Sequence, residues 1–128
     1  MNIHVVCPSF RKKCGIGEYA KYLSNEFKKT GLDVYEHRRV VDVVRSGRLN
    51  LNSFIIVNHG PGLYDGFNPE LSEGEATIEF VRLLKLYKKT YGCEVLIYLH
   101  SLLDSDNKVM YGRQMAIIRS GLRVATTI

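Results

Sequence analysis

The sequence has 128 residues and a mass of 14.6 kDa, which is enough for a single domain, residues 1–128, with one core. Hydrophobic residues make up 45% and charged residues 24%, a globular composition that excludes an intrinsically disordered chain. The formal net charge of +5 attracts phosphate groups, nucleic acid and anionic lipid alike, so it selects no partner among them.

The sequence carries no pattern for export or for crossing a membrane. No apolar run reaches the roughly 18 residues of a membrane span, and Met1–His4 is not the basic start of a signal peptide, so we expect a cytoplasmic protein. Cys7, Cys14 and Cys93 form no close pair, which indicates neither a disulfide framework nor a metal knuckle. Cys7 and Cys93 are expected to be small core residues.

Strands and helices are expected to alternate along the chain. Short apolar runs between turn residues predict strands over Ile3–Cys7, Leu32–Arg38, Phe54–Val57, Glu94–Leu99 and Leu122–Thr127. Helical spacing predicts helices from Gly15 to about Thr30, within Pro69–Tyr91, and from about Val109 to Arg119. In the second of these helices, the residues that recur at helical spacing are Ile78, Val81, Leu84 and Tyr87 or Lys88. The segment Val40–Leu51 fits either a short helix or an irregular crossover.

This alternation predicts an α/β fold: a doubly wound, Rossmann-like, five-stranded parallel sheet with helices on both faces. The expected strand order is 3-2-1-4-5, with the second strand less buried because it contains Asp33, Glu36 and His37. Ligands of such sheets bind at the carboxyl ends of the strands, beside the point where the winding reverses. This order places that point between the first and fourth strands and brings the loops after strands one, three and four together.

The turn before the first helix contains Gly15, Ile16 and Gly17. Glycines let backbone N–H groups approach a ligand closely, and the amides of a first helical turn add positive potential. We therefore expect these three residues to bind a phosphate group. A Walker A loop is disfavoured, because its lysine and hydroxyl positions hold Glu18 and Tyr19, and Glu18 is explained by the helix dipole alone.

The dinucleotide-binding fingerprint is also incomplete. Its third glycine is replaced by Ala20, which the fold tolerates, but no acidic residue closes the second strand. His37 and Arg38 stand at that place instead.

The chain resembles the N-terminal domain of retaining glycosyltransferases with the GT-B fold, family 4 in particular. The residues that carry the likeness are Cys14–Tyr19, Leu23–Gly31, Asp33–Tyr35, Asn58–Gly60 and Val95–His100. The resemblance implies sugar transfer from a nucleotide sugar without a further cofactor. In that family a C-terminal domain with a Glu, seven residues, Glu signature holds most of the donor, and this sequence lacks it.

A partner is therefore expected to complete the cleft, either a second protein chain or another copy of this one. The exposed apolar surface expected for that contact is the last strand, with Leu122, Val124 and Ile128.

The resemblance also implies roles for residues after the third and fourth strands. His100 would lie near the reacting sugar and stabilise charge there, with a capping or core role as the alternative. The residues expected to contact the acceptor are His59, Gly60, Tyr64, Asp65 and Ser101. No metal site is expected, because Asp104 and Asp106, which match an Asp-x-Asp signature, precede a helix and suit capping.

Three functions stay open from the sequence. The first is the acceptor-side part of a split or partnered sugar transferase, and whether the chain is itself an enzyme stays open with it. The second is a non-catalytic Rossmann-like binding or scaffold module, and the third is a degenerate P-loop nucleotide-binding protein. Lys85–Lys89 are expected to form a solvated helix end, with docking on a membrane surface as the alternative, and the lack of interleaved aromatic residues argues against nucleic acid.

Overall fold

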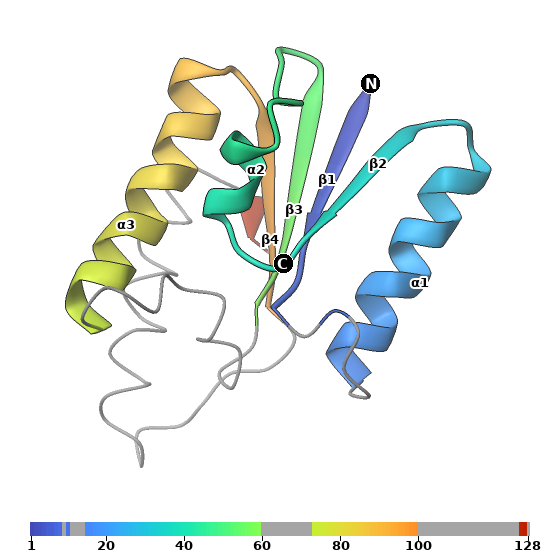
Figure 1. The fold of residues 1–128 in the computed structure, drawn as a ribbon, viewed down its shortest axis with the longest axis horizontal. Coiled ribbons are helices and arrows are strands. Elements are labelled where there is room, and N and C mark those ends of the chain that lie inside the picture. The colour runs from blue at the N-terminus through green and yellow to red at the C-terminus, as the bar shows by residue number, and fades with distance from the viewer. Residues whose placement is uncertain (9, 11–14, 60–72, 100–125, 128) are drawn as a thin grey trace.

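A parallel β-sheet with helices on both faces forms the centre of the molecule in the computed structural model (Figure 1). The structure describes residues 1–8, 10, 15–59, 73–99 and 126–127. The strands are β1 (Asn2–Val6), β2 (Asp33–His37), β3 (Ser53–His59), β4 (Glu94–Leu99) and β5 (Thr126–Thr127). The helices are α1 (Gly15–Lys29), α2 (Val41–Arg45) and α3 (Glu73–Lys85), and α3 continues into the π-helix η2 (Leu86–Thr90). The predicted α/β, Rossmann-like parallel sheet is confirmed.

The strands follow the order β2-β1-β3-β4-β5, and all neighbours are parallel. The predicted order 3-2-1-4-5 was wrong, because β3 lies between β1 and β4. Burial explains the difference: Ile55, Ile56 and Val57 are buried on the two faces of β3, which favours an internal position, whereas β2 is only half-buried or exposed. The less buried position predicted for β2 is confirmed by its place at one end of the described sheet.

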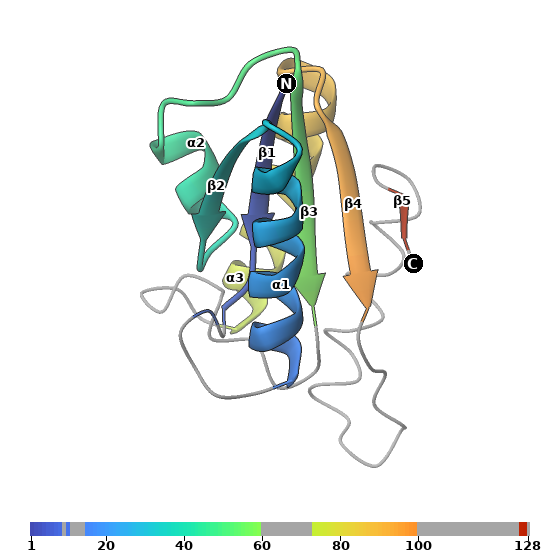
Figure 2. The ribbon, with the colours of Figure 1, turned by 90° about the vertical axis from the view of Figure 1, so that its right-hand side faces the viewer.

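α1 covers one face of the sheet, and α2 and α3 lie on the other (Figure 1, Figure 2). The chain passes from β1 through α1 to β2 and then returns through α2 to β3, so the reversal places the next helices on the opposite face. Cys7 belongs to the core beneath α1 and Cys93 to the core beneath α2 and α3, which confirms both as buried core residues. The core beneath α1 also contains Ile3, Val5, Phe10, Ala20 and Ile56.

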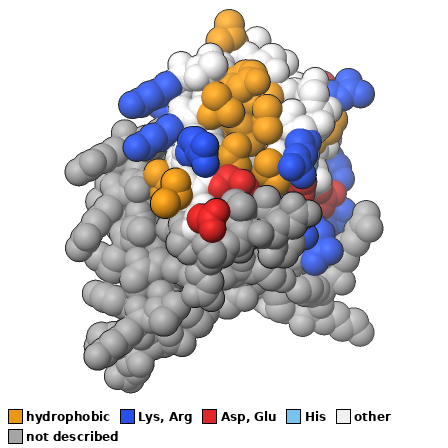
Figure 3. Space-filling model, turned by 60° about the vertical axis from the view of Figure 1, so that its left-hand side comes forward, with side chains coloured by type: hydrophobic (Ala, Val, Ile, Leu, Met, Phe, Trp, Pro, Cys, Tyr) orange, Lys and Arg blue, Asp and Glu red, His pale blue; other side chains and the backbone are white. Residues whose placement is uncertain are grey.

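α3 and η2 face the sheet with Phe80, Leu84 and Tyr87, which are all buried. Ile78, by contrast, is 64% exposed. Spacings of four and three residues keep the buried set on one face, whereas a residue two positions before Phe80 lies roughly 200° around the helix. Figure 3, which brings this side of the molecule forward, shows apolar side chains grouped between Lys and Arg side chains.

The hydroxyl of Tyr87 joins η2 to α2. It donates to the carbonyl oxygen of Val40 at 2.6 Å and accepts the backbone N–H of Val44 at 3.3 Å. Burial raises the pKa of Tyr87 well above its usual range, so the hydroxyl stays protonated and able to donate. α2 has five residues, too few to be stable by itself, so this contact and the burial of Val43 hold it in place.

Cys14 and two predicted features lie outside the described residues: the helix over 109–119, and the contact surface of Leu122, Val124 and Ile128. Of the fifth strand predicted over 122–127, the described part is Thr126–Thr127, which pairs with Leu96 and Ile97 of β4. None of the described helices is long and apolar enough to cross a membrane.

Candidate functional site

The carboxyl ends of β1 and β3 lie side by side and form the switch point of the sheet. β1 pairs with β2 on one side and with β3 on the other, and the winding of the chain reverses between these two connections. Ligands of doubly wound sheets bind outside this point. The predicted adjacency of the first and fourth strands was wrong, because β3 separates them, although all the strands are parallel and end at one edge.

α1 begins at Gly15, and its first turn lies at the end of the sheet where the strands end (Figure 2). Gly15 is exposed, and among the described residues outside its own helix a Cβ added to it would meet no atom within 4 Å. Gly17 is buried, and Ile16 packs against the core beneath α1. Of the three residues predicted to bind phosphate, Gly15 therefore offers its backbone to solvent most openly, while the other two anchor the start of the helix.

Asn58 fixes the two strands at the switch point. Its buried side-chain amide donates from Nδ2 to the carbonyl oxygen of Val6 at 3.3 Å, which joins the ends of β3 and β1. Sequence analysis assigned Asn58 no role, although a polar residue at the end of the apolar run Phe54–Val57 is the signal that could have identified it.

The other predicted site residues are only partly placed. The backbone of His59 ends β3 and pairs with Leu99 of β4, at the same edge as Gly15. The remaining predicted contacts lie outside the described residues: Gly60, Tyr64, Asp65, His100 and Ser101.

A small cavity of about 250 Å³ opens beside this edge, between Pro8, Arg38, Arg39 and Asp42. The Nε–H of Arg38 donates to the carbonyl oxygen of Pro8 at 3.4 Å, and Asp42 Oδ2 accepts the backbone N–H of Arg39 at 3.2 Å. Within the described part of the chain, no carboxylate lies within ion-pair distance of either guanidinium. The cavity therefore contains two cationic groups that are not neutralised by direct pairing there.

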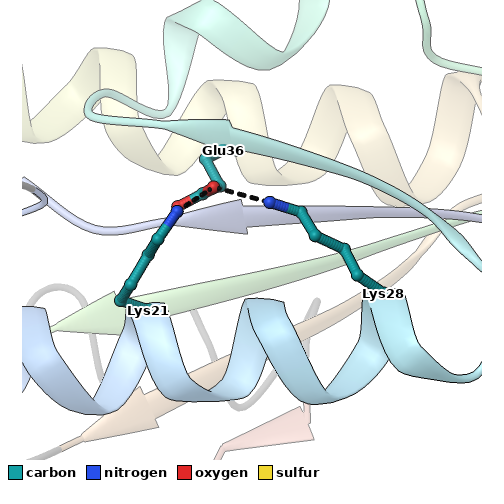
Figure 4. Close-up of polar contacts among 3 residues, drawn as sticks. All are labelled: Lys21, Lys28 and Glu36. Carbon is teal, nitrogen blue, oxygen red and sulfur yellow. Dashed lines mark hydrogen bonds and ion pairs between the residues drawn. The ribbon is translucent and has the colours of Figure 1, made fainter.

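An adjoining cavity of about 380 Å³ shares Arg38 and is lined also by Phe10, Lys21, Glu36 and His37. Glu36 accepts hydrogen bonds from Lys21 at 2.9 Å and from Lys28 at 3.1 Å, which tie α1 to β2 (Figure 4). Burial opposes the ionisation of Glu36, but hydrogen bonds from the two ammonium groups outweigh it and hold the pKa of Glu36 below its usual value. Because two lysines share one carboxylate, this cavity adds to the positive potential of the edge.

A pair of histidines joins β1 and β2, and one of them, His37, lines the adjoining cavity. The buried ring of His4 stacks on His37, and its Nδ1 lies 2.9 Å from His37 Nε2, while its Nε2 lies 3.3 Å from the carbonyl oxygen of Arg48. A carbonyl can only accept, so a neutral His4 donates from Nε2 and accepts at Nδ1 from the Nε2–H of His37. Sequence analysis missed this pair, because it joins residues 33 positions apart.

The histidine pair predicts a loss of stability at acid pH. Burial, with a smaller contribution from His4, lowers the pKa of His37 from 6.5 to about 4, and burial also lowers the pKa of His4. Between pH 6.5 and about pH 4 the unfolded chain binds more protons than the folded chain, so the free energy of unfolding falls as pH falls. Because His37 is partly screened by solvent, we expect a loss of about 1–2 kcal/mol from this residue.

Urea unfolding at both ends of this pH range measures the effect. His37→Gln keeps an N–H donor for His4 but does not titrate, so its pH dependence should be shallower than that of the wild type. An identical slope in the two proteins would contradict the assignment.

Among the residues that the structure describes, no three His, Cys, Asp or Glu side chains form a group that could hold a metal ion. Asp104 and Asp106 lie outside those residues. Comparison with protein-family models, with curated proteins and with solved structures gave no match. The likeness to GT-B glycosyltransferases therefore rests on the motifs of the sequence.

Proposed function

We propose that this chain is the acceptor-side, N-terminal part of a GT-B type sugar transferase and acts with a donor-binding partner. The observation that carries the proposal is the start of α1: Gly15 lies at the carboxyl edge of the sheet, at the switch point, with open space around its α-carbon. The first-turn amides and the helix dipole favour a phosphate group there. Arg38 and Arg39 at the same edge increase the attraction for anions.

In this proposal the donor diphosphate approaches the backbone of Gly15–Gly17, and the segments after β3 and β4 supply the acceptor contacts and His100. Glu18 is exposed in the first turn of α1, so its charge opposes an anion bound at the helix start. We therefore expect the chain alone to bind a nucleotide sugar weakly and the partner to provide most of the affinity.

Replacing Gly15 by alanine tests the role of the helix start. Apart from its chain neighbours and the helix's own backbone, no atom of the described residues lies within 4 Å of the added Cβ, so alanine should leave the fold of the free chain unchanged. A lower affinity must then come from crowding of the ligand. Crowding by the methyl group would move the phosphate out of reach of one backbone N–H. Loss of one hydrogen bond to a charged phosphate corresponds to about 1.5–3 kcal/mol, so calorimetry with UDP-glucose or GDP-mannose should show about tenfold weaker binding or more.

Asn25→Ala is the matched control, because Asn25 is exposed on the same helix beyond its first turn. Gly17→Val is less suitable, because Gly17 is buried and a branched side chain there would disturb the packing of α1. Equal affinity in the wild type and Gly15→Ala would contradict the proposal. Preferential binding of ATP with magnesium would instead support a degenerate P-loop protein.

A further inference from the structure

We infer that the cavity lined by Pro8, Arg38, Arg39 and Asp42 binds the phosphomonoester end of a small phosphorylated molecule. Arg38 and Arg39 directly follow β2, and β2 pairs with β1, so the cavity lies at the same sheet edge as the start of α1. The inference depends on the connection between β2 and α2 and not on sugar transfer.

The charge around the cavity favours a dianion. Two guanidinium groups line it with one carboxylate, and Asp42 already accepts the backbone N–H of Arg39. Glu36 of the adjoining cavity is shared by Lys21, which also lines that cavity, and by Lys28 of α1, which leaves a further positive charge nearby. Positively charged groups therefore outnumber carboxylates on this part of the surface.

The type of cation points to phosphate. A guanidinium presents its N–H donors in a planar fork that matches two oxygens of a phosphate, and such paired hydrogen bonds are stronger than those between neutral groups. The Arg38 side chain is oriented by the contact of its Nε with the Pro8 carbonyl, while both Nη groups have no described partner. The volume of about 250 Å³ is below the range of about 300–1,000 Å³ that suits drug-sized ligands, so a phosphate with a short substituent fits it.

The topology gives an independent reason for a ligand here. In dinucleotide-binding sheets of the order 3-2-1-4-5-6, an acidic residue at the end of the second strand binds the ribose hydroxyls, and an arginine near that place accommodates a phosphate on the ribose. The present sheet has a different order but shares the parallel pairing of β2 with β1. This chain has His37, Arg38 and Arg39 there. An arginine pair at that position selects a phosphorylated group over a free hydroxyl.

A titration with inorganic phosphate at constant ionic strength tests the inference. Calorimetry and the NMR signals of the arginine Nε–H groups are used to monitor binding. Arg38→Gln is expected to weaken binding about tenfold or more, because one charged hydrogen-bonding partner is removed. Asp42→Asn should strengthen binding, because it removes a negative charge from the cavity. Arg45→Gln is the matched control, since Arg45 is exposed in α2 and does not line the cavity.

The inference would be overturned if Arg38→Gln and Arg45→Gln lost the same affinity, or if millimolar phosphate did not bind the wild type. Thermal unfolding of each variant shows whether the fold is retained. If Gly15→Ala weakened binding of the nucleotide sugar while Arg38→Gln left the affinity for phosphate unchanged, this inference would be overturned and the proposed function would stand. The reverse result would support the cavity and count against the role of the helix start.

The phosphomonoester could belong to a free metabolite or to a lipid headgroup, and two further measurements separate these sources. Binding of glycerol 3-phosphate that depends on Arg38 assigns the cavity to a soluble compound. Co-sedimentation with phosphatidylcholine vesicles containing phosphatidic acid, again dependent on Arg38 and absent for phosphatidylcholine alone, assigns it to a headgroup. Failure of both probes to depend on Arg38 would contradict the inference.

Discussion

The 128-residue chain, assayed by itself, is expected to transfer no sugar from a nucleotide sugar at an enzymatic rate. Glycosyl transfer requires donor and acceptor to be held in near-attack geometry with water excluded, and positioning alone contributes about 7–11 kcal/mol to such catalysis. In the proposed function, the carboxyl edge of this sheet supplies one wall of that cleft. A donor-binding domain added as a second chain should therefore raise the rate of nucleoside diphosphate release by a factor of about 10⁵ or more.

Gly15→Ala should reduce that rate in the two-chain mixture, and Asn25→Ala should not. Light scattering on the chain alone shows whether it is monomeric under the assay conditions. A monomer that turns over a nucleotide sugar unaided, at the rate of about 1 s⁻¹ or more that is usual for enzymes, would contradict the requirement for a partner.

Tyr87→Ala, which removes the aromatic side chain, is expected to cause the largest loss of stability among the single substitutions proposed for this chain. Tyr87 is fully buried, and truncation of a large aromatic residue in a core costs about 3–5 kcal/mol. Tyr87→Phe separates the contribution of the hydroxyl, because it leaves the buried Val40 carbonyl and the Val44 N–H without this partner. We expect it to cost about 1–3 kcal/mol and to loosen α2 first.

Urea unfolding gives the free energies, and hydrogen exchange at Val43 and Val44 reports on α2. Tyr91→Phe is the matched control, since the same atom is removed from a half-buried tyrosine whose hydroxyl has no hydrogen-bond partner among the described residues. Equal stability of Tyr87→Phe and Tyr91→Phe would show that the Tyr87 hydroxyl does not hold α2.

The layers of the fold could be predicted from the sequence because they follow local patterns. The glycine turn and the apolar spacing through Ala20 and Leu23 define α1 and the face it buries. Polar residues in β2 indicated its outer position. These features depend on neighbours a few residues away, so a single sequence contains them.

The strand order and the cationic cavities could not be predicted, because they depend on contacts between distant segments. α2 has five residues, and its periodicity is too short to show that it packs on the opposite face from α1. The cavity at Arg38 forms only when the end of β2 lies beside Pro8 after β1. His4 and His37 likewise meet only through the pairing of these two strands.

Backbone amide NMR during a titration with UDP-glucose tests most directly whether the carboxyl edge of the sheet binds a phosphorylated ligand. Glycine amides are useful reporters, because Gly15 lies at this edge while Gly31 and Gly92 precede β2 and β4 at the opposite edge. We expect the signals of Gly15 and Ile16 to shift with increasing ligand and those of Gly31 and Gly92 to stay in place. Shifts confined to Gly31 and Gly92, or no shift at Gly15 when ligand is bound, would contradict the account.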